Sequence, residues 1–160
     1  MVTRQLNKGC FGRLLTIAAL FVLLTSPTSY SQTSVDTALA NRLGADGYGM
    51  KRYVMAFLKA GPNRNQDSVT AMNLQKAHLG NIQRMAKEGK LVLAGPFLDD
   101  TDIKGIYIFN VESVEEAKAL TESDPAIKAG RLVMELHPWY GSAALQMVND
   151  LHARIQTKKF

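Results

Sequence analysis

His78 is the residue of this chain best suited to acid–base chemistry. It lies in a pattern of apolar residues spaced three or four apart, one helical turn from both Leu74 and Ile82. This pattern predicts a helix that points the imidazole toward a sheet. An imidazole changes its charge near neutral pH and is a frequent general base. The alternative is a core histidine whose N–H binds a backbone carbonyl.

A second candidate is the break predicted at Gly95 and Pro96, after the apolar residues Leu91–Ala94. Glycine permits special backbone angles and proline removes a donor of the strand ladder, so this pair is predicted to end a strand. Breaks of this kind often lie beside functional sites. We therefore predict that Gly95, Pro96 and Phe97 line the mouth of a pocket, with a purely structural strand ending as the alternative.

The sequence contains no recognisable metal or cofactor motif. Its three histidines, at positions 78, 137 and 152, share no ligand spacing, and its single cysteine, Cys10, precedes an apolar run near the N-terminus. The acidic residues between positions 99 and 102 lack the spacing and glycine of a calcium loop and are interpreted as a solvated turn. A glycine-rich phosphate loop and a nucleophile elbow are also missing. We expect no metal ion and no cofactor.

The spacing of apolar residues predicts the elements that position these candidates. Alternation predicts four strands, over residues 50–60, 90–94, 104–111 and 131–137, the last of them ended by Pro138. Local signals predict a long helix from a cap at Ser68 to about residue 88. Two shorter helices follow, one from a capping box at Ser113 and Glu116 and one from Asp124 to a stop at Gly130. Further helices are predicted over 142–156 at the C-terminus and, shorter, over 35–43. The core order βαββαβ is that of a ferredoxin-like α+β fold.

Both faces of the predicted sheet are apolar, which indicates a partner. The first strand places Tyr53, Met55 and Phe57 on one face and Val54, Ala56 and Leu58 on the other. A pair of helices covers one sheet face, and an antiparallel sheet usually leaves its other face polar. Because the second face is apolar here, we predict a homodimer in which two sheets pack face to face.

Residues 1–31 match a secretory signal peptide. Basic residues come first, the apolar run Leu14–Leu24 follows, and Ser29 and Ser31 occupy positions −3 and −1 of a predicted cut before Gln32. The apolar run is shorter than the roughly 17–25 residues that cross a bilayer, so stable membrane insertion is not expected. The protein is predicted to be exported, to the periplasm or out of the cell. The alternative is an uncleaved anchor or a disordered tail.

Four segments follow from this organisation: the signal over 1–31, an extension with a glycine-rich loop over 32–49, a domain over 50–141, and a C-terminal helix and tail over 142–160. The net charge of +5 is concentrated at the start, where three of the 19 basic residues precede every acidic one. The remainder is nearly balanced and shows no basic stripe. We therefore expect no nucleic-acid partner.

Seven short segments together resemble the YCII-related (YciI-like) family over about residues 51–141. They are Ala77-His78-Leu79, Glu88-Gly89-Lys90-Leu91, Ala94-Gly95-Pro96, Gly105-Ile-Tyr-Ile-Phe109, Ser113-Val-Glu-Glu-Ala117, Asp124-Pro125-Ala126-Ile-Lys-Ala-Gly130 and His137-Pro-Trp-Tyr140. Their order and spacing carry the resemblance. It implies a dimeric α+β barrel built from two ferredoxin-like units, and it implies dehydrochlorinase-type elimination as the associated chemistry.

The resemblance also implies a catalytic pair of histidine and aspartate, which falls here on His78 and Asp124. A carboxylate can orient an imidazole and stabilise its charged form. Asp124 also precedes Pro125, a combination typical of a helix cap and first helical position. The two roles are compatible, because one carboxylate oxygen can cap the helix while the other meets His78. The pair requires a tertiary contact, since the third predicted strand and a helix lie between the two residues along the chain.

These observations lead to three hypotheses about function. The first is a small exported enzyme without a cofactor, in which His78 transfers a proton on a small cyclic or aromatic compound and Asp124 orients the ring. The second is a non-catalytic or stress-related dimer that binds a small ligand in the same pocket. The third is a purely structural interaction module. An open cleft that reaches the His78 ring favours the first two, and a sealed histidine favours the third.

Overall fold

The computed structural model describes residues 34–158, so the predicted signal peptide and its cut before Gln32 lie outside the described residues. The described helices and strands all belong to one unit, Asp36–Phe160. In chain order they are α2 (Thr37–Arg42), β1 (Met50–Ala60), α3 (Ser68–Lys87), β2 (Leu91–Pro96), β3 (Ile103–Phe109), α4 (Val114–Thr121), α5 (Pro125–Lys128), β4 (Leu132–Ser142), the 3₁₀ helix η1 (Ala143–Met147) and α6 (Val148–Ile155).

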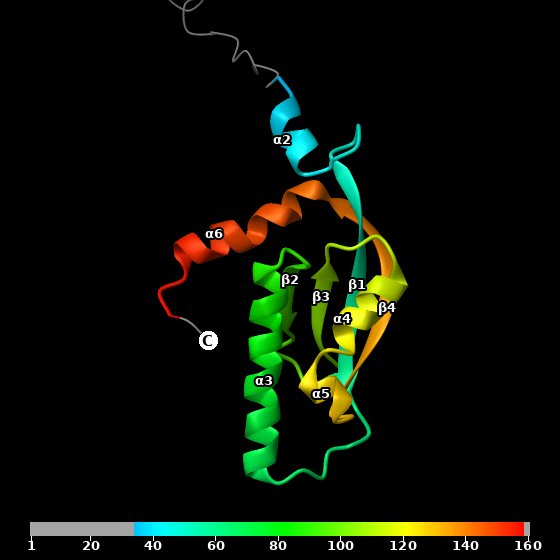
Figure 1. Cartoon of the computed structure of the whole chain (residues 1–160), viewed down its shortest axis with the longest axis vertical. Helices are drawn as coiled ribbons and strands as arrows, with labels where there is room; N and C mark the ends of the chain where they lie inside the picture. The colour runs from blue at the N-terminus through cyan, green and yellow to red at the C-terminus, as the bar shows by residue number, and fades with distance from the viewer. Residues whose placement is uncertain (1–33, 159–160) are drawn as a thin grey trace, which may run out of the picture. The chain divides into compact units, whose positions relative to one another are not determined.

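The four strands form one antiparallel sheet in the order β2-β3-β1-β4. Helix α3 packs against β2, and α4 and α5 pack against β4, on the same side of the sheet (Figure 1). The predicted βαββαβ order is present, with α4 and α5 together in the place of the second helix. This arrangement is consistent with the predicted ferredoxin-like α+β fold.

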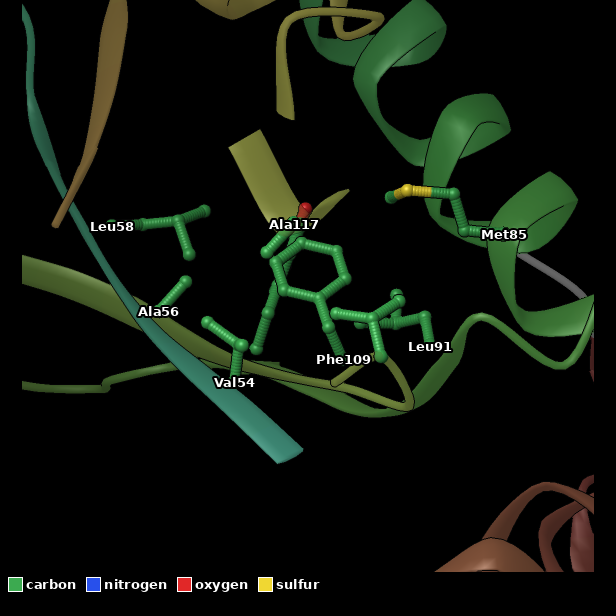
Figure 2. Packing of buried hydrophobic residues seen from close by; sticks show 9 residues of the cluster. Val54, Ala56, Leu58, Met85, Leu91, Phe109 and Ala117 are labelled. Atoms are coloured by element: carbon green, nitrogen blue, oxygen red, sulfur yellow. The ribbon is translucent and has the colours of Figure 1, made fainter. Parts of the chain in front are cut away.

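The main core lies between the sheet and these helices. Val54, Ala56 and Leu58 of β1 share one face, as the alternation predicted. This face lies toward the helices, and Met85 of α3 and Ala117 of α4 close over it (Figure 2). Phe109 of β3, which is fully buried, completes the centre of this cluster. The core therefore ties α3 and α4 to the middle of the sheet, which fixes the two elements that carry His78 and lead into Asp124.

The opposite face of the sheet is also apolar, as predicted. It carries a second cluster built on Tyr53, Val92 and Ile108, with the partly buried Met55, Leu93, Trp139 and Leu145 packed against it. Leu145 belongs to η1, so the C-terminal region covers one part of this face. The rest carries half-buried or exposed apolar side chains, including Phe57, Ile106 and Val133, and next to β4 also the polar Lys59, Glu135 and His137.

Two predicted strand endings were wrong. Strand β2 continues through Gly95 and Pro96, which pair with Ile106 and Gly105, and β4 continues past Pro138 to Ser142. Both are edge strands. A proline has no N–H, and on the unpaired side of an edge strand this removes no hydrogen bond from the sheet. The strand predicted to break after residue 94 therefore continues to Pro96 along the edge of the sheet.

The helix caps match the predictions in part. Ser113 caps α4 by accepting from the Glu116 amide at 3.1 Å, but the Glu116 side chain pairs with Lys90 at 2.9 Å and does not reach back to complete a capping box. The cap of α3 is Asp67, not Ser68. The predicted C-terminal helix is divided into η1 and α6. None of the helices between residues 34 and 158 has the length and hydrophobicity of a membrane-spanning segment.

Candidate active site

His78 and Asp124 form a direct, buried contact. The imidazole Nδ1 lies 2.7 Å from the Asp124 Oδ2, and their side chains are 8% and 0% exposed. His78 comes from the middle of α3, and Asp124 from the turn between α4 and α5. The tertiary contact that the pair requires is therefore present.

The Asp124 carboxylate also caps a helix, so its two expected roles coexist. Its Oδ1 accepts from the backbone N–H of Ala126 at 2.8 Å. Its Oδ2 accepts from His78 and, at 3.3 Å, from the side-chain amide of Asn81. Burial acts to raise the pKa of Asp124. The hydrogen bond and charge of His78, with the bonds from Ala126 and Asn81, outweigh burial and hold that pKa below its ordinary value of 3.8. The carboxylate is thus ionised near neutral pH.

The segment that follows α5 is held against the end of β1 and the loop after it. The Gly61 amide donates to the Arg131 carbonyl at 2.9 Å, and the Asn63 amide donates to the Gly130 carbonyl at 3.0 Å. Gly61 has to be glycine at this close approach, because a Cβ there would lie 2.2 Å from the Gly130 carbonyl oxygen. These backbone contacts connect the loop after β1 to the end of α5, close to the catalytic candidate.

The second nitrogen of His78 faces Tyr107. An ionised carboxylate only accepts, so His78 donates through Nδ1–H, and in the neutral imidazole this leaves Nε2 as an acceptor. The Tyr107 hydroxyl lies 3.2 Å from that Nε2, with the two rings stacked at 6.2 Å between centroids. Burial, with the nearby Asp124 charge, raises the pKa of Tyr107 well above its ordinary value. The phenol therefore stays protonated and donates to Nε2.

His78 and Tyr107 line a cavity of about 360 Å³ under α3, next to the β2 edge. Its wall is largely apolar and includes Leu58, Leu79, Ile82, Ala94 and Leu132. Ala94 and Pro96 are exposed, so the cavity opens to solvent. A volume of this size suits a single small ring compound.

The structure brings Gly95 and Pro96 to this cavity, but not Phe97. Both Gly95 and Pro96 are among its lining residues, whereas Phe97 is outside the lining and 45% exposed. A larger hollow, of about 930 Å³, lies at the other end of β1, beside Trp139 and Tyr140. That hollow contains none of the predicted site residues, so we place the candidate site in the smaller cavity.

Sequence analysis missed two residues of this site, Tyr107 and Asn81. Tyr107 falls within the strand predicted over 104–111, but the sheet order that brings β3 beneath His78 depends on long-range pairing. Asn81 follows His78 by three positions on α3, so it lies on the same helix face. Helical spacing from His78 could have indicated it.

No described residues, 34–158, form a group of three or more histidine, cysteine, aspartate or glutamate side chains that could hold a metal ion. His137 lies on β4 and pairs with Glu135 at 3.0 Å, away from His78. The acidic residues between 99 and 102 are exposed, and Asp100 pairs with Lys104 at 3.1 Å. In the described part of the chain, the side chains suited to acid–base chemistry that lie together are those around His78.

The family model of the YCII-related domain matches residues 53–140, more than half of the chain. The protein belongs to the YCII-related family. The matched part of this YCII-related chain contains His78, Asn81, Tyr107 and Asp124, and also the Gly95 and Pro96 wall of the cavity. The short helix α2 and the C-terminal α6 lie outside the matched residues.

Two individual proteins resemble this YCII-related chain. It is 31% identical over 62 residues to the uncharacterized protein YjpA of Bacillus subtilis (strain 168), a match that covers 39% of this chain and 71% of YjpA. A solved structure, the 5-chloro-2-hydroxyhydroquinone dehydrochlorinase TftG of Burkholderia phenoliruptrix AC1100 in complex with 2,5-dihydroxybenzoquinone, is 24% identical and covers 54% of this chain and 92% of its own. Its TM-score is 0.40, which supports no transfer of activity from TftG.

Proposed function

We propose that this YCII-related protein is a small exported enzyme that uses no cofactor and transfers a proton on a small cyclic or aromatic compound. One observation carries the proposal: the Asp124 carboxylate fixes His78 through Nδ1, and the opposite nitrogen is directed to Tyr107, with both His78 and Tyr107 lining an open apolar cavity. This is the geometry of an oriented general base.

In the proposed reaction, Nε2 of His78 accepts a proton from a carbon atom of the bound compound. The Asp124 carboxylate stabilises the imidazolium that forms. The Tyr107 hydroxyl, released from Nε2, donates to the substrate oxygen on which negative charge develops. The electron pair left on the carbon then either expels a leaving group, which is elimination, or takes a proton back at another atom, which is isomerisation. Dehydrochlorinase-type elimination is the course that the family resemblance implies.

A non-catalytic binding function, including a stress-related one, is the second candidate. It is favoured by the Tyr107 hydroxyl, which already occupies Nε2 in the free protein at 3.2 Å. A screen of metabolite pools with the wild type and His78→Gln tests both functions. Loss of turnover with retained ligand binding supports the enzyme, whereas a compound that binds to both proteins and is turned over by neither supports the binder.

Filling the cavity should weaken function without affecting the fold. Ala94 pairs with Tyr107 across β2 and β3 and lines the cavity, so Ala94→Leu places three more carbon atoms beside the His78 site. We expect it to weaken ligand binding or kcat/KM by about tenfold or more. Ala77→Leu is the matched control, since Ala77 is exposed on α3 and outside the cavity lining. Equal binding by the two variants, measured by calorimetry, would argue against this cavity as the site.

We also propose that a second copy of the chain covers the apolar face of the sheet, as the family resemblance implies. Light scattering after size exclusion, at low micromolar concentration, should give twice the chain mass. Ile106→Glu, which places a charge among the apolar residues of this face, should give a monomer. Leu98→Glu is the control, because Leu98 is 99% exposed and lies outside the sheet. A stable wild-type monomer would refute the dimer.

Export is part of the proposal and depends on the signal pattern in residues 1–31. The mature chain is expected to begin at Gln32. Intact-mass analysis of protein recovered from the periplasm or the medium checks this start directly. A mass that still includes residues 1–31 would contradict cleavage.

A further inference from the structure

Asn81 connects the buried Asp124 carboxylate to a positively charged side chain. It lies on α3, three residues after His78, and is 8% exposed. Its Nδ2 donates to Asp124 Oδ2 at 3.3 Å, and its Oδ1 accepts from Arg84 Nη2 at 2.9 Å. A neutral amide therefore bridges the guanidinium of Arg84 and the carboxylate of Asp124.

The chemistry of its two neighbours permits one orientation of the Asn81 amide. A guanidinium only donates hydrogen bonds, and an ionised carboxylate only accepts them. A flipped amide would direct its oxygen at the carboxylate and its NH₂ group at the guanidinium, which loses both hydrogen bonds and adds repulsion. Arg84 thus keeps the donor side of Asn81 on Asp124.

Ser123 holds Arg84 in place. Its hydroxyl donates to the Leu120 carbonyl at 2.6 Å, with Asn81 Oδ1 as the alternative acceptor at 3.2 Å, and its oxygen accepts from Arg84 Nη2 at 3.1 Å. The same guanidinium uses Nη1 to pair with Glu88, one turn along α3, at 2.7 Å. Arg84 therefore has fixed contacts on α3 and on the residue directly before Asp124.

We propose that Asn81 is a positioning residue, held by Arg84 and Ser123, that keeps the Asp124 carboxylate aimed at His78 as a hydrogen-bond acceptor. The consequence is a fixed Nδ1–H form of His78, with Nε2 left for the cavity. The catalytic part of this inference rests on the proposed function. The alternative role for Asn81 is structural only, as a buried amide that satisfies its own hydrogen bonds.

The groups that face the Asp124 carboxylate come from each element packed around it. They are His78 and Asn81 from α3 and the Ala126 amide from α5, with the Tyr107 hydroxyl of β3 beyond the other nitrogen of His78. Arg84 and Glu88 form the layer behind Asn81. Because Asn81 donates to the charged form of Asp124, its removal should raise the pKa of that carboxyl.

Carbon-13 NMR of the aspartate carboxyl groups during a pH titration tests the positioning role without any substrate. Asp124→Asn identifies the signal of Asp124. In the full chain, Asn81→Leu is expected to raise the pKa of Asp124 by about one pH unit, and Arg84→Met by roughly half as much. Lys87→Met is the matched control, since it removes an exposed cation from the same helix outside this network. It should leave the titration unchanged.

The positioning role would be overturned if Asp124 had the same pKa in Arg84→Met and Asn81→Leu as in the wild type, while the helical circular dichroism of both variants stayed intact. If Asn81→Leu does not fold, Arg84→Met decides alone, because its side chain is 44% exposed and its loss leaves no cavity in the core. The result is independent of turnover. The titration can fail while His78 still proves essential for activity, and His78 can prove dispensable while the titration shifts as expected.

Discussion

Replacing His78 by glutamine is expected to lower kcat about 10²–10⁴-fold, the range lost when a general base is removed. Glutamine can still donate an N–H to Asp124, but it cannot take up a proton near neutral pH. Glutamine therefore replaces the buried hydrogen bond to Asp124, which is 2.7 Å long in the wild type, but it does not replace the base. Steady-state rates on a compound found in the metabolite screen give the loss, and thermal unfolding shows whether the fold persists.

His152→Gln is the control for this experiment. His152 is exposed on α6 and lies outside the cavity lining, so the same substitution there should leave kcat unchanged. A drop in kcat of similar size in both variants would mean that the loss does not depend on the position of His78 in the cavity. An unchanged rate in His78→Gln would remove the general base from the proposed mechanism.

Asp124→Asn should reduce kcat over a similar range, about 10²–10⁴-fold, by changing which nitrogen of His78 carries the proton. The asparagine oxygen can still accept from the Ala126 amide, so its NH₂ group then faces His78 and the donor side of Asn81. Two donors that meet leave a buried group unsatisfied, at a cost of about 1–3 kcal/mol of unfolding free energy. The imidazole responds by protonating Nε2, which can then no longer accept a proton.

The same variant has a defined effect on stability at acid pH. The pKa of Asp124 in the folded protein lies below its ordinary value of 3.8. The stabilisation by the carboxylate is therefore complete above about pH 4 and is lost as the pH falls from there through the folded pKa. The difference in unfolding free energy between the wild type and Asp124→Asn should therefore shrink as the pH falls below about 4. Urea unfolding at a series of pH values measures it, and a difference that grows below about pH 4 would contradict this sign.

Features decided by neighbouring residues could be predicted from the sequence. Strand β1 spans Met50–Ala60, as its alternation predicted, and its two faces carry the residues assigned to them. Asp124 caps α5 because the Asp-Pro pair fixes a local backbone choice. Ser113 caps α4 for a similar local reason.

Features decided by the order of strands could not be predicted in this way. Pro96 and Pro138 lie inside strands because β2 and β4 are the two edges of the sheet, and no local pattern shows which strands are edges. Tyr107 joins the site because β3 runs next to β1 beneath α3. Phe97, one residue past the end of β2, lies outside the cavity for the same reason: its position depends on how far the edge strand continues.

The most direct test of the central claim, proton transfer by His78, is the exchange of a substrate carbon-bound hydrogen for deuterium in D₂O. A panel of small cyclic compounds with an acidic C–H beside a carbonyl is incubated with the wild type, His78→Gln and Ala94→Leu, and proton NMR follows the loss of the C–H signal. The His78 ring signal shows which compounds enter the cavity. We predict that the wild type catalyses exchange on at least one compound that binds, and that both variants lose this activity. Exchange at the same rate in His78→Gln, or no exchange on any compound that reaches His78, would contradict the account.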